Sequence, residues 1–208
     1  MARLSRSTHF DWRLAPYDLM QTRAHAQVLE RAGLLSQDES RGVVLALDTL
    51  ATQVANGEFT PNEDDEDVHS AVERGLMSLL GELGGKLRAG RSRNDQVATD
   101  FKLYLRDHAQ QIAGEVIYLQ EAFLDQANEN ISTHSPGFTH LQHAQPVSFA
   151  HELAKHVHAL GRDLERLSDW DSRAARSPLG AGALAGSSLG LDPELVADTL
   201  GFDSALGN

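Results

Sequence analysis

The sequence contains no cysteine and only six prolines among its 208 residues. The absence of cysteine excludes disulfides, thiolate metal sites and cysteine nucleophiles. The scarcity of proline, together with few alternating β-branched stretches, favours helix nearly throughout. No apolar run approaches the ~20 residues of a membrane-spanning helix, and the opening MARLSRSTHF lacks the apolar centre of a secretory signal. We therefore expect a cytoplasmic protein with no membrane partner.

Positive charge is also scarce. The 18 Lys and Arg residues stand against 30 Asp and Glu, which gives a formal net charge of −12. This balance argues against a protein whose whole surface binds nucleic acid or anionic lipid. The apolar fraction of 41% is sufficient for a packed core. The length suits one sizeable domain, or one domain plus a small second one.

Periodicity and helix-ending residues predict several helices. Ser36 and Glu39 have the spacing of a capping box at one helix start. The acidic run of residues 63–67 is expected to open another helix, because negative charge is stabilised at the positive end of the helix dipole. The expected helices cover residues 15–32, the stretch from the Ser36 cap to about residue 55, residues 63–80, residues 95–128, a segment from near Pro146 and a segment from near Asp192.

Two of these helices are long. The helix over residues 95–128 would measure roughly 50 Å, which is too long for a small monomer to cover its apolar face. From Ala150 to Leu167 the apolar residues step by 3, 4, 3, 4 and 3, the pattern of a coiled-coil seam. We therefore predict an all-α fold, with a small N-terminal helical domain over residues 1–88 and a partial long-helix bundle domain over residues 89–208. The bundle predicts a homo-oligomer.

The segment GGKLRAGRSRNDQVATD, residues 84–100, concentrates positive charge in this acidic chain. Its four cations are Lys86, Arg88, Arg91 and Arg93. Glycines let the backbone approach a ligand, and arginine guanidinium groups match carboxylates with two hydrogen bonds. The helix that follows offers free N–H groups at its start. These features favour a carboxylate-binding site over the alternative of a solvated charged face.

A second candidate lies in residues 135–152, SPGFTHLQHAQPVSFAHE, where Thr139 and His140 fall in an expected loop. A loop histidine beside a hydroxyl group can act as a general acid or base. The alternative is a histidine that caps a helix or binds a carbonyl group.

The ten histidines do not form a metal-binding pattern. His151 and His156 are five positions apart, about 140° around a helix, so their rings would not share a face. His140 and His143 have no obvious third ligand. We expect no metal site. The glycine-rich segment after Arg176 is not preceded by an expected strand, which excludes a dinucleotide-binding loop.

Taken together, the loop string and PGFTHLQHAQPVSFAH resemble argininosuccinate lyase, a family of the fumarase/aspartase superfamily. The resemblance extends to STHFDWRLAPYD, NEDDEDVHSAVERGL and LGAGALAGSSLGLD, and so to nearly the whole chain. It implies the reversible elimination of argininosuccinate to arginine and fumarate by a homotetramer, without a cofactor. The string DLMQTRAH stands where the family usually has one like DIxGSxAH, which leaves the role of Gln21 and Thr22 open.

The resemblance also implies site residues. His140 would be the catalytic acid/base histidine. Arg93 and Asn94 would hold the substrate, and Thr139 would bind one of its carboxylates. The full set of implied substrate-binding residues is Ser7, His69, Arg91, Ser92, Arg93, Asn94 and Thr139.

The family continues with a further long helix, a mobile loop carrying SSxMPxKxN and a C-terminal domain, none of which is found in these 208 residues. That loop supplies a serine believed to abstract the proton, and each active site combines segments of three subunits. We therefore expect an N-terminal fragment that does not turn over alone. The alternatives are a sibling fumarate-releasing lyase, a crystallin-like structural protein of the same fold, and a helical nucleic-acid-binding adaptor. The net charge weighs against the adaptor.

Overall fold

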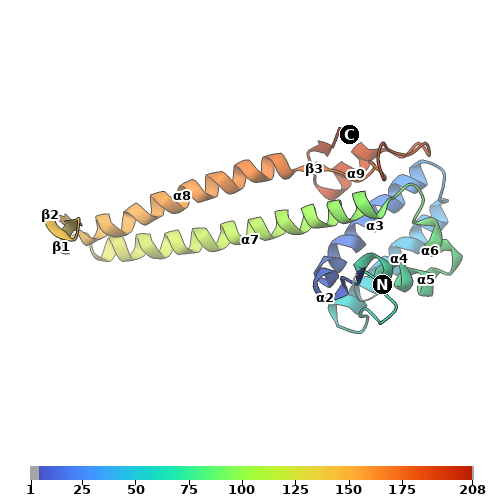
Figure 1. Cartoon of the computed structure of the whole chain (residues 1–208), viewed down its shortest axis with the longest axis horizontal. Coiled ribbons are helices and arrows are strands. Elements are labelled where there is room, and N and C mark those ends of the chain that lie inside the picture. Colours follow the sequence, from blue (N-terminus) through green and yellow to red (C-terminus); the bar gives the residue numbers. More distant parts are fainter. Residues whose placement is uncertain (1–4, 208) are drawn as a thin grey trace. The chain divides into compact units, whose positions relative to one another are not determined.

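The computed structural model of the chain describes residues 5–207, and helices dominate them (Figure 1). The all-α prediction is therefore confirmed, although two small sheets accompany the helices. The helical elements are α2 (Thr8–Asp11), η1 (Trp12–Leu14), α3 (Ala15–Arg31), α4 (Gln37–Ala55), α5 (Val68–Leu80), α6 (Glu82–Lys86), α7 (Arg93–Glu129), α8 (Phe149–Ala174) and α9 (Pro193–Leu200). The strands are β1 (His134–Thr139), β2 (Gln142–Ser148), β3 (Arg176–Ser177) and β4 (Ser204–Ala205).

Contacts divide the chain into two compact units. The first unit comprises the chain up to Tyr104 and from Ala175 onward, and the second comprises Leu105–Ala174. Helix α7 contributes its start to the first unit and the remainder to the second. The expected domains 1–88 and 89–208 stay a prediction. Within the described residues, no helix has both the length and the apolar character needed to cross a membrane.

The core of the first unit forms where α3, α4 and α5 pack together. Helix α5 buries Val68, Val72 and Leu76, which recur every four residues along one face. A second cluster joins the opposite face of α3 to α9 and to the start of α7. Because the loop between α6 and α7 is tied to these elements, the two clusters together fix its position.

The starts of α4 and α5 test two predictions made from the sequence. Ser36 and Glu39 form the expected capping box at the start of α4. The acidic run of residues 63–67 does not open a helix as expected. Instead Asp67 caps α5 by accepting a hydrogen bond from Ser70 N–H, because a side-chain acceptor satisfies a free helical N–H more directly than a dipole does.

The segment between the two long helices is an antiparallel hairpin, not the expected loop. Strands β1 and β2 pair from His134 with Ser148 to Thr139 with Gln142. As a result α8 begins at Phe149 and not near Pro146. A two-residue strand, β3, also precedes the glycine-rich segment, contrary to expectation, but it pairs only with β4.

In the second unit, α8 runs beside the part of α7 that belongs to this unit (Figure 1). Arg106 forms an ion pair with Asp171 at 2.7 Å, and Gln120 donates to the Val157 carbonyl at 2.8 Å. No described residue of α8 is fully buried. Two helices alone therefore leave much of their apolar seam in contact with solvent.

Candidate functional site

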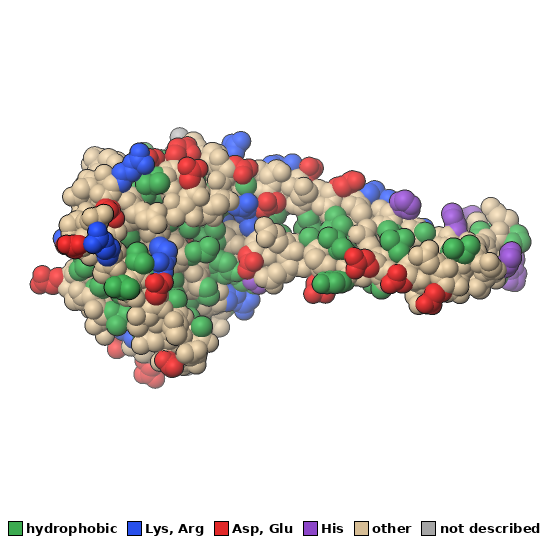
Figure 2. All heavy atoms as spheres, turned by 180° about the vertical axis from the view of Figure 1, so that it is seen from behind, with side chains coloured by type: hydrophobic (Ala, Val, Ile, Leu, Met, Phe, Trp, Pro, Cys, Tyr) green, Lys and Arg blue, Asp and Glu red, His purple; other side chains and the backbone are tan. Residues whose placement is uncertain are grey.

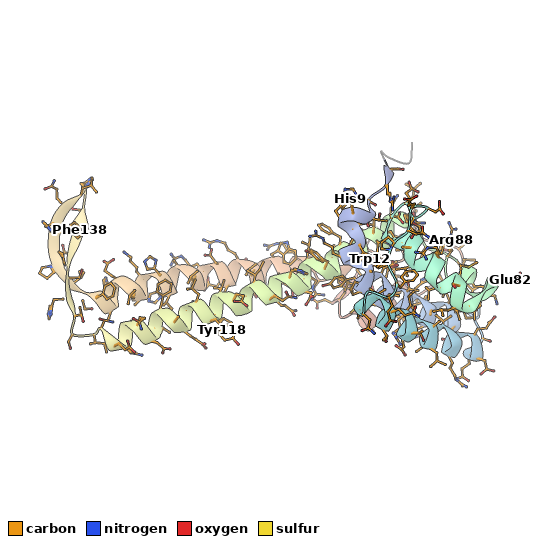
Figure 3. The ribbon with its side chains drawn as sticks, turned by 90° about the horizontal axis from the view of Figure 1, so that it is seen from below. His9, Trp12, Glu82, Arg88, Tyr118 and Phe138 are labelled. Carbon is orange, nitrogen blue, oxygen red and sulfur yellow. The ribbon has the colours of Figure 1, made fainter. Side chains whose placement is uncertain are left out.

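The arginine loop lies beside a pocket of the first unit. Its lining comes from α3, α5, α6, the loop and the start of α7. The pocket encloses about 90 Å³, whereas sites for whole small molecules hold roughly 300 Å³ or more. In this chain the pocket therefore has room for a carboxylate-sized group. The polar residues of the lining include Asp18, His69, Glu73, Arg88, Arg91, Ser92, Arg93 and Gln96. Figure 3 labels Arg88 on this unit.

Two features give the loop its path. Gly90 has a φ of +72°, and a Cβ there would lie 2.2 Å from the Leu191 side chain, so only glycine fits. Asp95 is buried, and its Oδ1 accepts from Ser92 N–H at 3.0 Å. Its Oδ2 accepts from the N–H groups of Gly180 and Gly182 at 3.0 and 2.8 Å. One carboxylate thus joins the arginine loop to the glycine-rich segment. Sequence reasoning missed this role, although the Ser92–Asp95 spacing is that of a cap.

Arg91 is partly buried and lines the pocket. It donates to Gln21 Oε1 at 3.2 Å and to Thr22 Oγ1 at 3.0 Å. These contacts give Gln21 and Thr22 a role that the sequence left open, because both side chains hold this guanidinium. Burial lowers the pKa of Arg91, and the charges of Asp18 and Asp100 oppose that effect.

Arg93 already binds carboxylates of its own chain. Its guanidinium forms an ion pair with Asp67, the cap of α5, and lies 3.9 Å from Glu73. Glu73 also pairs with Arg88 at 3.2 Å. The Arg93 side chain remains 41% exposed, so a ligand carboxylate can reach it and compete with Asp67. Asn94 is exposed and does not line the pocket.

His69 lies between two buried carboxylates. Its Nδ1 is 3.0 Å from Asp18 Oδ1 and 3.4 Å from Asp100 Oδ2. Burial raises the pKa of Asp18, but hydrogen bonding to His69 and Gln96, together with the charge of Arg91, outweighs burial, so that the pKa is lowered. Burial and the neighbouring Asp18 raise the pKa of Asp100 well above its ordinary value.

The same three side chains have the composition of a metal site. The ligand atoms of Asp18, His69 and Asp100 lie within 4.8 Å of one another. A proton at Nδ1 accounts for the 3.0 Å contact equally well. Glutamine amides already donate to one oxygen of each carboxyl group at 2.6 Å, so each group has a hydrogen-bond donor within the protein.

Ser7 lies outside this pocket. Its N–H donates to the Glu66 carbonyl at 2.9 Å, and its hydroxyl donates to Asp11 at 2.5 Å. It lines a separate apolar hollow with Phe10 and Phe101. Ser7 is therefore tied to the segment that carries Asp67, the partner of Arg93.

Thr139 and His140 belong to the second unit. Both are exposed at the hairpin turn, where His140 and Leu141 have φ of 52° and 61°. Positive φ is unusual for residues other than glycine and often marks functional sites. The structure thus gathers His69, Arg91, Ser92 and Arg93 in one pocket and places Thr139 and His140 elsewhere in the chain. The site as a whole stays a prediction.

Comparisons with known proteins agree with the motifs. The argininosuccinate lyase of Frankia casuarinae is 60% identical over 208 residues, which cover 100% of this chain and 45% of that protein. The enzyme of Streptomyces coelicolor is 59% identical over 210 residues, covering 100% and 44%. A solved structure of an EDDS lyase variant with bound fumarate has a TM-score of 0.82 at 29% identity, covering 94% of this chain and 38% of that one.

This chain thus spans less than half the length of the curated relatives it matches. The resemblance to argininosuccinate lyase that the motifs indicated is confirmed by these relatives. A family model described as lyase matches residues 1–207. Because that match covers almost the entire sequence, the chain belongs to the lyase family.

Proposed function

We propose that the whole protein cleaves argininosuccinate reversibly to arginine and fumarate. The observation that carries the proposal is the pocket where Arg91, Arg93 and His69 meet around a carboxylate-sized space. Arginine guanidinium groups recognise carboxylates, and the succinyl portion of argininosuccinate carries two. The relatives near 60% identity are argininosuccinate lyases, and their similarity extends over the full length of this chain. The EDDS lyase structure contains fumarate, the acid that this reaction would release.

The reaction is an elimination. A base removes a proton from the carbon beside a carboxylate, and that carboxylate takes up the electron pair as an aci-carboxylate. The electrons then form the double bond of fumarate, the carbon–nitrogen bond breaks, and the departing guanidine nitrogen takes a proton. Cations placed at the aci-carboxylate would stabilise its additional negative charge. Holding both carboxylates also aligns the bond that breaks.

The residue roles follow this chemistry. We assign Arg93 and Asn94 to the substrate, and Arg91 and Ser92 to support of the loop. Arg93 suits its role because it is partly exposed and already forms an ion pair with a carboxylate. Arg91 suits a supporting role because two side chains of α3, Gln21 and Thr22, hold its guanidinium.

Ser7 would contact the amino-acid end of the substrate, His69 would line the site and Thr139 would bind a carboxylate. His140 would transfer the proton of the departing group as a general acid or base. No cofactor takes part in this scheme.

The pocket of this chain is smaller than the substrate requires, and we propose that further segments complete it. The site would be assembled in a cytoplasmic homotetramer from segments of different subunits, including a serine-bearing loop outside these 208 residues. We accordingly expect no fumarate from the 208-residue chain alone. Fumarate formation clearly above background, followed by ultraviolet absorbance, would contradict this expectation.

The test of the function uses the chain extended to the length of its relatives. We expect fumarate release from argininosuccinate, and we expect Arg93→Ala to lower kcat/KM by about 100-fold or more, the scale for losing one group that stabilises developing charge. Circular dichroism should show unchanged helix content. Arg31→Ala is the matched control, because Arg31 is exposed on α3 and outside the pocket. Unchanged kinetics for Arg93→Ala would remove that residue from the site.

A further inference from the structure

His69 lies in an almost fully buried group of three titratable side chains. The His69 side chain is 3% exposed, and its two carboxylate neighbours, Asp18 and Asp100, are 1% and 0% exposed. The neighbours come from α3 and α7, whereas His69 belongs to α5. Three helices thus converge on one imidazole ring.

The contacts determine which ring nitrogen carries a proton. Asp18 Oδ1 can only accept from His69 Nδ1, because hydrogen bonding lowers the pKa of Asp18 and keeps it ionised. Nδ1 must therefore be the donor. Nε2 has no hydrogen-bond partner among the described residues, and His69 lines the pocket. In a neutral ring with its proton on Nδ1, Nε2 is an acceptor.

The surroundings keep Asp18 in place. Gln96 donates to Asp18 Oδ1 at 2.6 Å, and Gln21 donates to Asp100 Oδ1 at 2.6 Å. Gln21 also donates to the Gln96 carbonyl at 2.8 Å. The two amides therefore form one connected network around the carboxyl groups, and Gln96 donates to the same Asp18 oxygen that contacts His69. Movement of either carboxyl group would break bonds in this network.

One proton completes this network. Asp18 Oδ2 and Asp100 Oδ2 are buried and otherwise lack hydrogen-bond partners. Two carboxyl groups this close do not both ionise readily, and a proton held by Asp100 supplies the missing donor. The other charged groups facing the cluster are Arg91 and Asp95, together with Glu73 on α5. With Asp100 neutral, Arg91 balances the charge of Asp18.

We propose that Asp18 is a positioning residue that holds His69 with its proton on Nδ1 and presents Nε2 to the pocket as the acceptor for an N–H group of the substrate. The proposal rests on the proposed function for the identity of that substrate, which carries N–H groups on its guanidino portion. The three arginines of the pocket can only donate, and the Glu73 carboxylate is already engaged by Arg88 and Arg93. As an acceptor in the pocket, His69 Nε2 would therefore orient the nitrogen end of the substrate while the arginines bind the carboxylates.

The first experiment needs no substrate. Nitrogen NMR of the ¹⁵N-histidine-labelled 208-residue chain near neutral pH distinguishes protonated from unprotonated ring nitrogens, and His69→Gln assigns the signal. We expect Nδ1 to be protonated and Nε2 unprotonated. We expect Asp18→Asn to abolish this preference and Asp48→Asn, at an exposed site, to leave it unchanged. A protonated Nε2, or an unaltered signal in Asp18→Asn, would overturn the proposal.

A second variant and a zinc addition complete the NMR experiment. If Asp18→Asn does not fold, Gln96→Met removes a donor to Asp18 without a change of charge, and it should weaken the same preference. Zn²⁺ added to the unsubstituted chain should leave the His69 signals in place. Stoichiometric loss of the Nδ1 proton would show a metal site at Asp18, His69 and Asp100 and overturn the proposal.

A kinetic experiment separates this role from the proposed function. In the extended protein, Asp18→Asn should lower kcat/KM roughly 100-fold or more, as expected when a histidine loses its orienting carboxylate, and Asp18→Glu should recover part of the loss. Unchanged kinetics in Asp18→Asn would overturn the positioning role. An unsubstituted extended protein that does not cleave argininosuccinate would instead overturn the proposed function, while the NMR result would still decide the tautomer of His69.

Discussion

His25 links the arginine loop to the stability of the protein. It is buried on α3, and its Nε2 lies 2.9 Å from the Ala89 carbonyl in the loop. Burial and the charge of Arg91 lower its pKa to about 3, although the bond to Ala89 acts in the opposite direction. His25 is therefore neutral in the folded protein above about pH 3.

The pH dependence follows from that shift. The folded pKa of about 3 is below the unfolded value of 6.5, so the unfolded chain binds the proton first as the pH falls. The contribution of His25 to stability is complete above 6.5 and is lost between 6.5 and about 3. We expect the free energy of unfolding to fall by up to about 1.4 kcal/mol per pH unit from this group.

Urea unfolding across this pH range measures the effect. His25→Gln keeps a hydrogen-bond donor near Ala89 without a titrating ring. It should reduce the slope of the unfolding free energy against pH by the contribution of one proton. The control is His9→Gln, at an exposed position of the same unit, which should retain the full slope. Equal slopes in the two variants would contradict the assignment to His25.

Part of the candidate site could be predicted from the sequence, residue by residue. The arginines were predictable because their charge, their glycines and the following helix are adjacent in the sequence. Asp18 and Asp100 were not, because they meet His69 from helices 51 and 31 positions away. A carboxylate that will be buried has no local signature that separates it from one on the surface. Sequence reasoning therefore identified the pocket rim and missed its buried support.

At the scale of elements, two neighbouring glycines of α6 differ sharply in their surroundings. A Cβ at Gly84 would lie 3.1 Å from backbone atoms of Leu76 and Met77 in α5, and backbone atoms cannot move aside cheaply. A Cβ at Gly85 would meet only the flexible end of Met77, at 3.7 Å. The close approach of α5 and α6 therefore requires glycine at one position only.

We expect Gly84→Ala to destabilise the protein by about 1–3 kcal/mol, the cost of overpacking. Gly85→Ala is the matched control and should be neutral or stabilising by up to about 1 kcal/mol, because alanine favours helix. Chemical denaturation of both variants measures the difference. Similar stabilities would show that α5 and α6 are not in close contact.

The hairpin turn offers a second test at this scale. Thr139 pairs with Gln142, so His140 and Leu141 are the two central residues, and both have positive φ. Glycine is favoured there because it adopts positive φ without steric cost. Leu141 is 96% exposed and loses no packing when replaced. We expect Leu141→Gly to stabilise the hairpin by about 0.5–1 kcal/mol.

Leu141→Ala is the control, because alanine shortens the side chain but keeps the cost of positive φ. It should not stabilise the hairpin. Amide hydrogen exchange along β1 and β2 measures the effect locally. If both variants slow exchange equally, the removal of an exposed leucine explains the gain, and backbone strain does not.

The elements that sequence reasoning located were those with strong local signals. The helices at 15–32 and 95–128 and the cap at Ser36 agree with α3, α7 and α4 within a few residues. The hairpin was missed for physical reasons. Its turn lacks the Asn-Gly or Gly-containing sequence that two-residue turns favour. Its strands contain Pro136 and Pro146, which demote a strand prediction, and a ribbon of only two strands tolerates both.

At the scale of the whole molecule, the second unit lacks a core of its own. Apart from Ala127, none of its described hydrophobic residues is fully buried. Figure 2 shows hydrophobic side chains on the surface of this part of the chain. Figure 3 labels Tyr118, an α7 residue that is 70% exposed. Apolar area of this extent on two paired helices is typical of surfaces that other helices cover.

We therefore expect the chain to self-associate through the exposed face of α7. Ile112 and Leu119 are 54% and 47% exposed and lie two helical turns apart on that face. Full burial of such a side chain contributes about 1.5–3 kcal/mol, of which roughly half remains to be gained at each of these half-exposed positions. Replacing both with lysine should therefore shift the equilibrium toward monomer. Sedimentation velocity at several concentrations measures this shift, and circular dichroism should show that the helices persist.

The matched control adds the same charge at exposed polar positions of the same helix, Gln126→Lys with Asn128→Lys. It should associate like the unsubstituted chain, because it removes no apolar surface and like charge alone is screened at ordinary salt. If the control dissociates as well, repulsion explains the effect and the apolar face does not. If the unsubstituted chain sediments as a monomer at every concentration, this face is covered by a segment other than a second copy of the chain.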